Sequence, residues 1–191
     1  MTDFVLHLMR HGAPQRPGLM LGHLDEPPLA SGVAACMERA GALALKQIRC
    51  SDLARALLPA REIAGQRGLA VHIDPRWREL DFGAWDGMAP QQLPNDALAR
   101  FWDDPDAFPP PGGEMWSVLV RRVGEALAHI REDCLVVAHG GSIRAAVSYL
   151  TGLDHRGVWA FDLPYGALIS LRVWPGGKSA GQIIALETDA P

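Results

Sequence analysis

The chain has 191 residues, of which 48% are hydrophobic and 21% charged, and its formal net charge is −4 at pH 7. This length and composition are typical of one folded globular domain, which we expect to span residues 1–191. The acidic balance gives no sign of the basic stripe of a nucleic-acid-binding surface, and no apolar run approaches the roughly 18 residues that a membrane-spanning helix requires.

The three cysteines, Cys36, Cys50 and Cys134, lack the spacing of a metal or redox motif. Their odd number indicates free thiols, which we expect to be buried in a protein of a reducing compartment. The first ten residues do not contain the long apolar core of a secretory signal. The sequence therefore predicts a cytoplasmic protein with no membrane or nucleic-acid partner.

Short apolar runs alternate with helical patterns through the first half of the chain. A strand is predicted over 4–8, and a loop rich in proline and glycine follows over 13–30. Ser31 is a suitable N-cap for a helix over 31–46. The next predicted elements are a strand over 48–51, a helix over 52–66 that Pro59 is expected to kink or break, and a strand over 71–73.

The second half continues the alternation after an aromatic, acidic and glycine-rich segment over 76–94. The predicted elements are a helix over 96–103, a proline-rich connector over 105–111, a helix over 114–131, a strand over 135–138, a helix over 143–150, and strands over 167–174 and 182–186 joined by a turn at 175–177. This alternation predicts an α/β fold with a mostly parallel central sheet.

Two histidines follow predicted strands in the same context. His11 comes after the strand over 4–8 and His139 after the strand over 135–138, and each is followed by glycine. Parallel strands bring their carboxyl ends to one edge of the sheet, where ligands bind in open α/β folds. We therefore expect the two imidazoles to lie side by side in a site.

Arg10, Arg55 and Glu79 add the groups that phosphoryl transfer requires. Arg55 lies early in the helix after a third strand, and Glu79 follows a fourth. An imidazole nitrogen can attack phosphorus, and guanidinium groups bind phosphoryl oxygens, often bidentately. Protonated His139 would add a donor. A neutral Glu79 would protonate the leaving oxygen and then act as a base toward water.

Each of these residues also has a structural alternative. A single histidine at a strand end is more often structural than catalytic, and Arg55 can be a helix-surface residue with a packed stem. Glu79 can pair with Arg76 or Arg78 at the surface, and the two glycines can be simple turn residues. The joint arrangement favours the catalytic interpretation.

Five segments in this order resemble motifs of the histidine phosphatase superfamily, which includes the cofactor-dependent phosphoglycerate mutases. They are Arg10-His11-Gly12, the Ser51–Ala56 segment (SDLARA), residues 79–87 (ELDFGAWDG), residues 111–114 (PGGE) and residues 136–141 (VVAHGG). One Arg-His-Gly triplet is weak evidence, whereas five ordered motifs across residues 5 to 150 are strong evidence.

The resemblance implies a three-layer α/β/α sandwich in which His11 becomes phosphorylated. It implies that Arg10, Arg55 and His139 hold the phosphoryl group, that Glu79 donates the proton, and that neither a metal nor a cofactor takes part. The expected phosphate- and substrate-binding positions are Gly12, Arg16, Gly22, His23, Ser51 and Gly140.

The sequence departs from the family pattern after the first triplet. Many members continue with Glu-Thr or Glu-Ser and later carry an asparagine that contacts phosphate, whereas residues 13–17 here are Ala-Pro-Gln-Arg-Pro. Arg16 is then either a substitute anion contact or a solvated loop charge, and both alternatives stay open. The family's Thr-Ala in the second helix is Pro59-Ala60 here.

The chain length points to the small phosphatase branch. Mutases carry an insertion with added arginines, but Arg100 is the one basic residue between Gly87 and Pro111. Gly22-His23 and residues 82–87 are similar to those of alpha-ribazole phosphatases. We predict a phosphomonoester hydrolase for a small phosphorylated metabolite, with alpha-ribazole 5′-phosphate as a candidate. The alternatives are a phosphoglycerate mutase-type phosphotransferase and a non-catalytic phosphate-binding module.

Four tryptophans raise a further pair of alternatives. They either form a stacking surface for a ring-bearing leaving group or fill the core and its rim. The four are Trp85, Trp102, Trp116 and Trp159.

Overall fold

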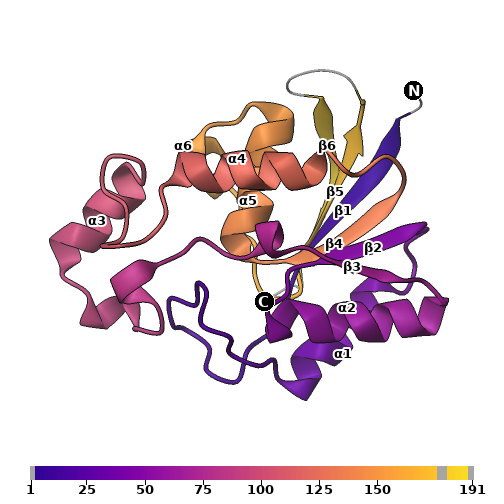
Figure 1. Cartoon of the computed structure of the whole chain (residues 1–191), viewed down its shortest axis with the longest axis horizontal. Helices are drawn as coiled ribbons and strands as arrows, with labels where there is room; N and C mark the ends of the chain where they lie inside the picture. Colours follow the sequence, from indigo (N-terminus) through magenta and orange to yellow (C-terminus); the bar gives the residue numbers. More distant parts are fainter. Residues whose placement is uncertain (1–2, 176–179, 189–191) are drawn as a thin grey trace.

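The computed structural model describes residues 3–175 and 180–188 and, within them, places a six-stranded sheet between layers of helices (Figure 1). The elements in chain order are β1 (Phe4–Arg10), α1 (Ala30–Ala40), β2 (Gln47–Cys50), α2 (Ala54–Arg67), β3 (Val71–Ile73), the 3₁₀ turns η1 (Pro75–Trp77), η2 (Gly83–Trp85) and η3 (Pro90–Gln92), α3 (Asn95–Asp103), α4 (Trp116–Leu127), β4 (Cys134–Ala138), α5 (Gly140–Thr151), α6 (His155–Trp159), β5 (Leu168–Val173) and β6 (Gly181–Glu187).

The strand order of the sheet is β3-β2-β4-β1-β5-β6. The first four strands are parallel, and β5 and β6 continue the sheet in antiparallel pairing. The predicted α/β/α sandwich with a mostly parallel sheet is confirmed. The carboxyl ends of β1, β2 and β4 meet at one edge, where the polar motifs begin.

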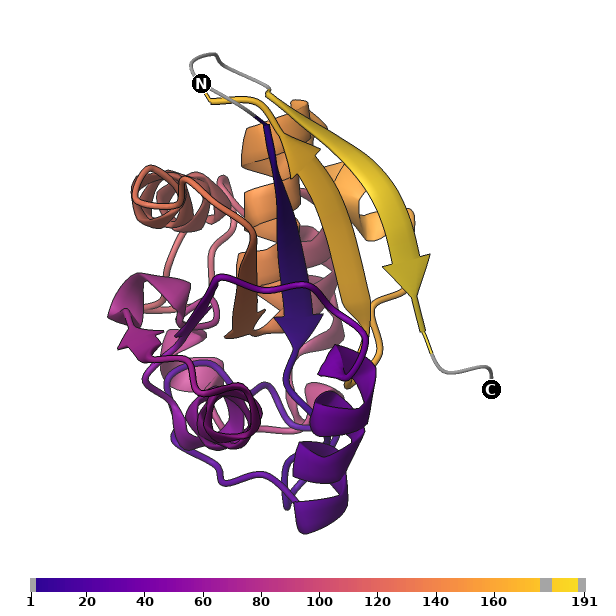
Figure 2. The ribbon, with the colours of Figure 1, turned by 90° about the vertical axis from the view of Figure 1, so that its right-hand side faces the viewer.

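Side chains that alternate along the central strands build two separate cores. Leu6 and Leu8 of β1 pack on the face covered by α4 and α5. Met9 of β1 and Val137 of β4 pack on the opposite face, against α1 and α2. Figures 1 and 2 show these two helix layers on either side of the sheet, with α3 set apart at the far end of the molecule. Buried strands of this kind need apolar residues on both faces.

Helix α1 differs from its prediction at both ends. It covers Ala30–Ala40 rather than 31–46, and Ser31 lies inside the first turn, so the predicted N-cap is wrong. The carbonyl groups just beyond the end of α1 are bound by a residue of α2. The Arg67 guanidinium donates hydrogen bonds to the carbonyl oxygens of Leu43 (2.7 Å) and Gly41 (3.1 Å). These bonds satisfy carbonyl groups that a longer helix would have bonded internally.

The other helices also differ from their predicted bounds. Helix α2 runs through buried Pro59 without a break, so the alternative that Pro59 ends the helix is wrong. Helix α4 begins at Trp116 rather than at 114, because Met115 has an extended backbone (φ −74°, ψ 151°). The Glu114 carboxylate, outside the helix, is bound by Arg122 at 2.7 and 2.8 Å. Helix α6 was not predicted. Its N-cap is Asp154, whose carboxylate accepts from the Gly157 N–H at 2.7 Å.

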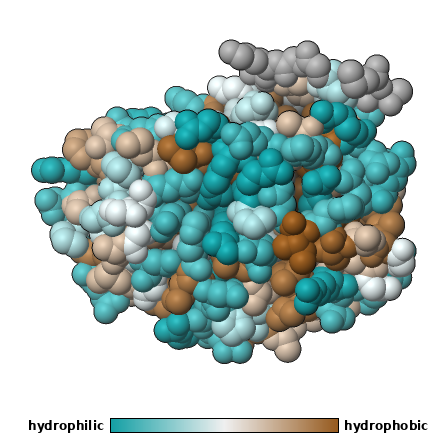
Figure 3. Space-filling view, in the orientation of Figure 1, coloured by the Kyte–Doolittle hydropathy of each residue, from teal (hydrophilic) through white to brown (hydrophobic). Residues whose placement is uncertain are grey.

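All three cysteines are free and buried, as predicted, and the predicted turn at 175–177 lies largely outside the described residues. Within the described ranges no helix is long and apolar enough to cross a bilayer. Figure 3 shows a mostly hydrophilic face on which apolar side chains gather in small patches.

Candidate active site

The register between β1 and β4 brings the two predicted histidines together. Arg10 is paired with Ala138, so that His11 and His139 follow at the same level of the sheet edge. The His11 N–H bonds to the Ala138 carbonyl at 3.0 Å, and the two imidazole centroids are 5.1 Å apart in an edge-on arrangement. The expected side-by-side placement is therefore present.

The His11 imidazole is held in a defined tautomer. Its Nδ1 lies 2.7 Å from the Gly12 carbonyl oxygen, and because a carbonyl can only accept, Nδ1 carries the proton. Burial lowers the pKa of His11 well below its usual value, and the charges of Arg55 and Arg10 lower it further. The neutral ring then presents an unprotonated Nε2, which is the atom a phosphorus nucleophile needs.

Unpartnered polar atoms surround this imidazole. Among the described residues, both ring nitrogens of His139 and the Nε atoms of Arg10 and Arg55 are buried and have no hydrogen-bond partner. Buried polar groups are nearly always hydrogen-bonded. These three residues lie next to the His11 imidazole, and burial lowers the pKa of both His11 and His139. Together they form a receptor for a small oxyanion.

The rest of each guanidinium is fixed by carbonyl groups. Arg55 is completely buried and donates to Leu24 (2.7 Å), Leu21 (3.0 Å) and Gly22 (2.7 Å). Arg10 Nη1 donates to Leu163 at 2.6 Å. Both side chains are therefore pre-oriented, and the helix-surface alternative for Arg55 is excluded by its burial.

Glu79 points into the same site. Its carboxylate accepts from the backbone N–H groups of Leu80 (2.8 Å) and Gly141 (3.0 Å). The surface-pair alternative does not hold, because Arg76 binds Asp74 and Arg78 binds Asp52. The carboxyl group thus lies between the loop after η1 and the start of α5, and it lines the same cavity as His11.

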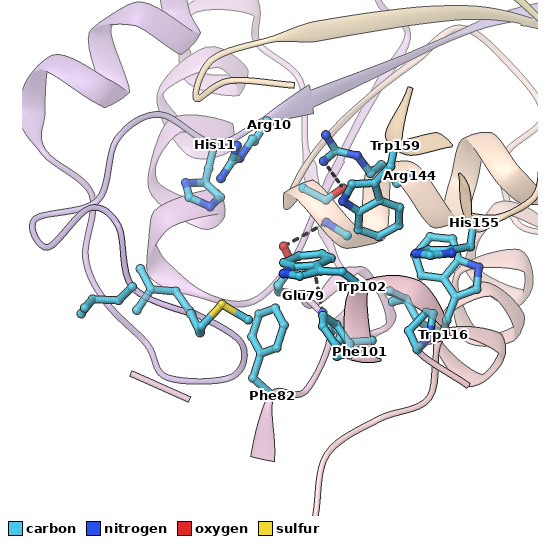
Figure 4. Close-up of a pocket in the computed structure, with 18 of the residues that line it drawn as sticks. Arg10, His11, Glu79, Phe82, Phe101, Trp102, Trp116, Arg144, His155 and Trp159 are labelled. Carbon is cyan, nitrogen blue, oxygen red and sulfur yellow. Dashed lines mark hydrogen bonds between the residues drawn. The ribbon is translucent and has the colours of Figure 1, made fainter. Parts of the chain in front are cut away.

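A cavity of about 180 Å³ opens over this group. Arg10, His11 and Glu79 line it (Figure 4), as does Gly140. Arg55 and His139 are fully buried and are not part of this lining. Figure 4 places Arg10 and His11 at one end of the cavity and Trp116 and His155 at the other.

The family model for the histidine phosphatase superfamily (branch 1) matches residues 6–183. The chain belongs to this superfamily. The adenosylcobalamin/alpha-ribazole phosphatase of Escherichia coli is 29% identical over 84% of this chain and 86% of its own length. The glucosyl-3-phosphoglycerate phosphatase of Mycolicibacterium vanbaalenii is 31% identical over 78% of this chain and 74% of its own.

A solved structure gives the same result for the fold. The alpha-ribazole phosphatase from Shigella flexneri superposes with a TM-score of 0.82 at 26% identity, over 97% of this chain and 96% of that one. Family membership and these relatives make the chain a phosphatase enzyme, and the predicted family and enzyme class are confirmed.

The remaining predicted binding residues of this histidine phosphatase have mainly supporting contacts. Ser51 is buried, and its Oγ accepts from the Leu53 N–H at 3.3 Å. The backbone N–H groups of Gly22 and His23 donate to the Asp86 carboxylate (2.8 and 2.9 Å), and the His23 ring lies 3.2 Å from the Glu79 carbonyl. These contacts hold the loop that orients Arg55.

Gly12 and Arg16 also lie outside the cavity lining. A Cβ on Gly12 would lie 2.1 Å from the Gly32 carbonyl oxygen, so this glycine permits a close approach of two backbones. Arg16 forms an ion pair with Glu26 at 2.6 Å, and its side chain is 60% exposed. In the structure Arg16 is therefore a paired loop charge outside the cavity lining.

Three residues of the site were missed by the sequence analysis: Gly141, Arg144 and Tyr165. The Tyr165 ring lies 5.5 Å from the His11 ring and 4.1 Å from the Arg10 Cζ. The signal was weak, because Tyr165 precedes a strand that pairs antiparallel to β1, and strand order cannot be read from motif spacing. Arg144 lies one helical turn after Gly140, on the cavity side of α5.

Proposed function

We propose that this histidine phosphatase hydrolyses phosphomonoesters through a phosphohistidine formed on His11 Nε2. In the first step Nε2 attacks phosphorus, the ester P–O bond breaks, and the leaving oxygen takes a proton from Glu79. In the second step Glu79 takes a proton from water, the resulting oxygen attacks phosphorus, and the P–N bond breaks to release inorganic phosphate.

The single observation that carries this proposal is the free Nε2 of His11 amid buried, unpartnered donors. Arg10 and Arg55 would bind the equatorial oxygens of the phosphoryl group, where negative charge accumulates in the transition state. Neutral His139 still offers one N–H, so it can donate without being protonated. The backbone N–H groups that bind Glu79 would keep its carboxyl on the leaving-group side.

The substrate we propose is a small phosphorylated metabolite, with alpha-ribazole 5′-phosphate as the first candidate because relatives carry that name. Mutase chemistry is disfavoured. Arg100, the basic residue of the segment that would have to grip a second acidic group, lies over the Phe108 ring at 5.7 Å.

The decisive experiment is acid-sensitive phosphoryl labelling of the protein during turnover of a phosphomonoester. We expect rapid-quench samples to carry label on His11, and His11→Ala to lose both label and turnover. His72→Ala, an exposed change on β3, is the matched histidine control. Label that persists in His11→Ala would overturn the nucleophile assignment, and isomerisation of 3-phosphoglycerate above its hydrolysis would favour the mutase.

A further inference from the structure

The cavity becomes aromatic away from the phosphate-binding end. Its far walls come from α3, the start of α4, and α6, which lie outside the sheet, together with Phe82 from the motif after Glu79. Trp159 lies 5.8 Å from Trp102 and 5.1 Å from Trp116, and His155 lies 5.0 Å from Trp159. Figure 4 shows these rings gathered around one space. They form a surface on which a planar group can stack.

The charge of the cavity wall restricts what can bind there. Among the described lining residues, the charged side chains are Arg10, Glu79 and Arg144. Arg10 and Glu79 belong to the reaction centre. No aspartate is present to bind an ammonium group, and none of the lining side chains is a serine, threonine, asparagine or glutamine.

Arg144 is the one cation of the wall that a second acidic group would have to use. Its guanidinium is already committed, since Nε, Nη1 and Nη2 lie 3.2, 3.5 and 3.3 Å from the carbonyl oxygens of Val158, Gly140 and Phe161. It also stacks over Trp159, with 5.1 Å from Cζ to the ring centroid. Arg144 therefore braces the aromatic wall, and three of its five N–H groups already have carbonyl acceptors.

We infer that the leaving group carries a planar, uncharged aromatic ring, and that phosphorylated amino acids and phosphoglycerates are poor substrates. This inference rests on the proposed function, because it assigns the occupant of the same site. Trp102 is the side chain best placed to test it, since it lines the cavity and is 42% exposed, so that its removal leaves the core intact.

The test compares three phosphate esters of primary alcohols, so that the leaving group is in each case a primary alkoxide of similar intrinsic reactivity. These are 2-(1-naphthyl)ethyl phosphate, ethyl phosphate and phosphoserine. We expect kcat/KM for the naphthyl ester to exceed that for ethyl phosphate at least tenfold, and phosphoserine not to exceed ethyl phosphate. Trp102→Ala should reduce the naphthyl preference by about tenfold. Trp174→Ala, a change at a 45% exposed tryptophan outside this cavity, should retain it.

Two readouts separate this inference from the proposed function. Phosphoryl label on His11 with equal kcat/KM for the naphthyl and ethyl esters would overturn the aromatic subsite and leave the hydrolase standing. Without label, calorimetric Kd values of the matching naphthylethyl and ethyl phosphonates still decide the subsite. Tenfold tighter binding of the aromatic phosphonate would support it, and equal Kd values would overturn it.

Discussion

The carboxylate of Glu79 accepts a hydrogen bond from the backbone N–H of Gly141 at 3.0 Å, which joins the loop after η1 to the first turn of α5. The contact is possible only without a side chain at position 141, because an added Cβ would lie 2.1 Å from Glu79 Oε1. The second glycine of the HGG motif therefore serves the carboxyl group rather than the helix.

Gly141→Ala should displace the Glu79 carboxyl and reproduce the defect of Glu79→Gln. We expect both variants to lose about 10²–10³-fold in kcat/KM on alkyl phosphates and much less on p-nitrophenyl phosphate, whose leaving group needs no proton. Gly65→Ala is the control, since a Cβ there meets no atom within 4 Å. Equal losses on both esters would contradict the role of Glu79 as the acid.

The stability of the protein should fall as the pH drops below 6.5. The folded state lowers the pKa of buried His11 and His139, so between pH 6.5 and the folded pKa the unfolded chain binds more protons. Each histidine then removes up to about 1.4 kcal/mol of stability per pH unit, while above pH 6.5 its contribution is constant. Urea titrations at pH 7.5, 6.0 and 5.0 measure the slope.

The variants His11→Asn and His139→Asn should flatten this dependence in turn, with His72→Asn as the exposed control. A slope that is identical in the single variants and in the unmodified protein would show that these imidazoles are not the groups that titrate.

Arg16→Ala should change kcat/KM by less than about threefold. Its exposed guanidinium is bound to Glu26 and lies outside the cavity, and surface ion pairs contribute little. Steady-state kinetics at low and high salt measure the effect, and Arg10→Ala, expected to lose most activity, provides the contrast. A large rise in KM for Arg16→Ala would restore the residue as an anion contact.

Gly12→Ala should destabilise the fold by at least about 2 kcal/mol, because the new methyl group would collide with the Gly32 backbone at the start of α1. Denaturant unfolding compared with Gly18→Ala, whose site is open but has a φ of +82°, separates collision from backbone strain. A smaller loss for Gly12→Ala than for Gly18→Ala would count against the close approach.

Much of the site was predictable because it follows from the ends of strands. The positions of His11 and His139 depend on the pairing of two parallel, mostly apolar strands, and such strands are visible as runs of buried residue types. The order of the motifs predicted the family, and the five candidates Arg10, His11, Arg55, Glu79 and His139 lie close together, while their catalytic roles stay a prediction.

The rest depended on long-range contacts that periodicity does not encode. Helix α1 ends where Arg67, a residue of the next helix, binds the carbonyl groups of Ala40 and Gly41. Tyr165 reaches His11 only through the antiparallel pairing of β5 with β1. The tryptophans divided between the two alternatives, since Trp85 is buried in the core whereas Trp102 and Trp159 line the cavity.

The hydrogen bonds between Arg55 and the carbonyl groups of the loop affect which sequences the loop can accept. Three main-chain carbonyls hold the guanidinium, and every residue type supplies a carbonyl. Selection on this contact therefore acts mainly on the path of the loop. Gly22 is an exception, because an added Cβ there would lie 2.7 Å from the Leu80 carbonyl oxygen. Residues 13–17 (Ala-Pro-Gln-Arg-Pro) can therefore replace the usual polar residues of the family while Arg55 keeps its orientation. Side chains in this part of the loop can acquire other roles.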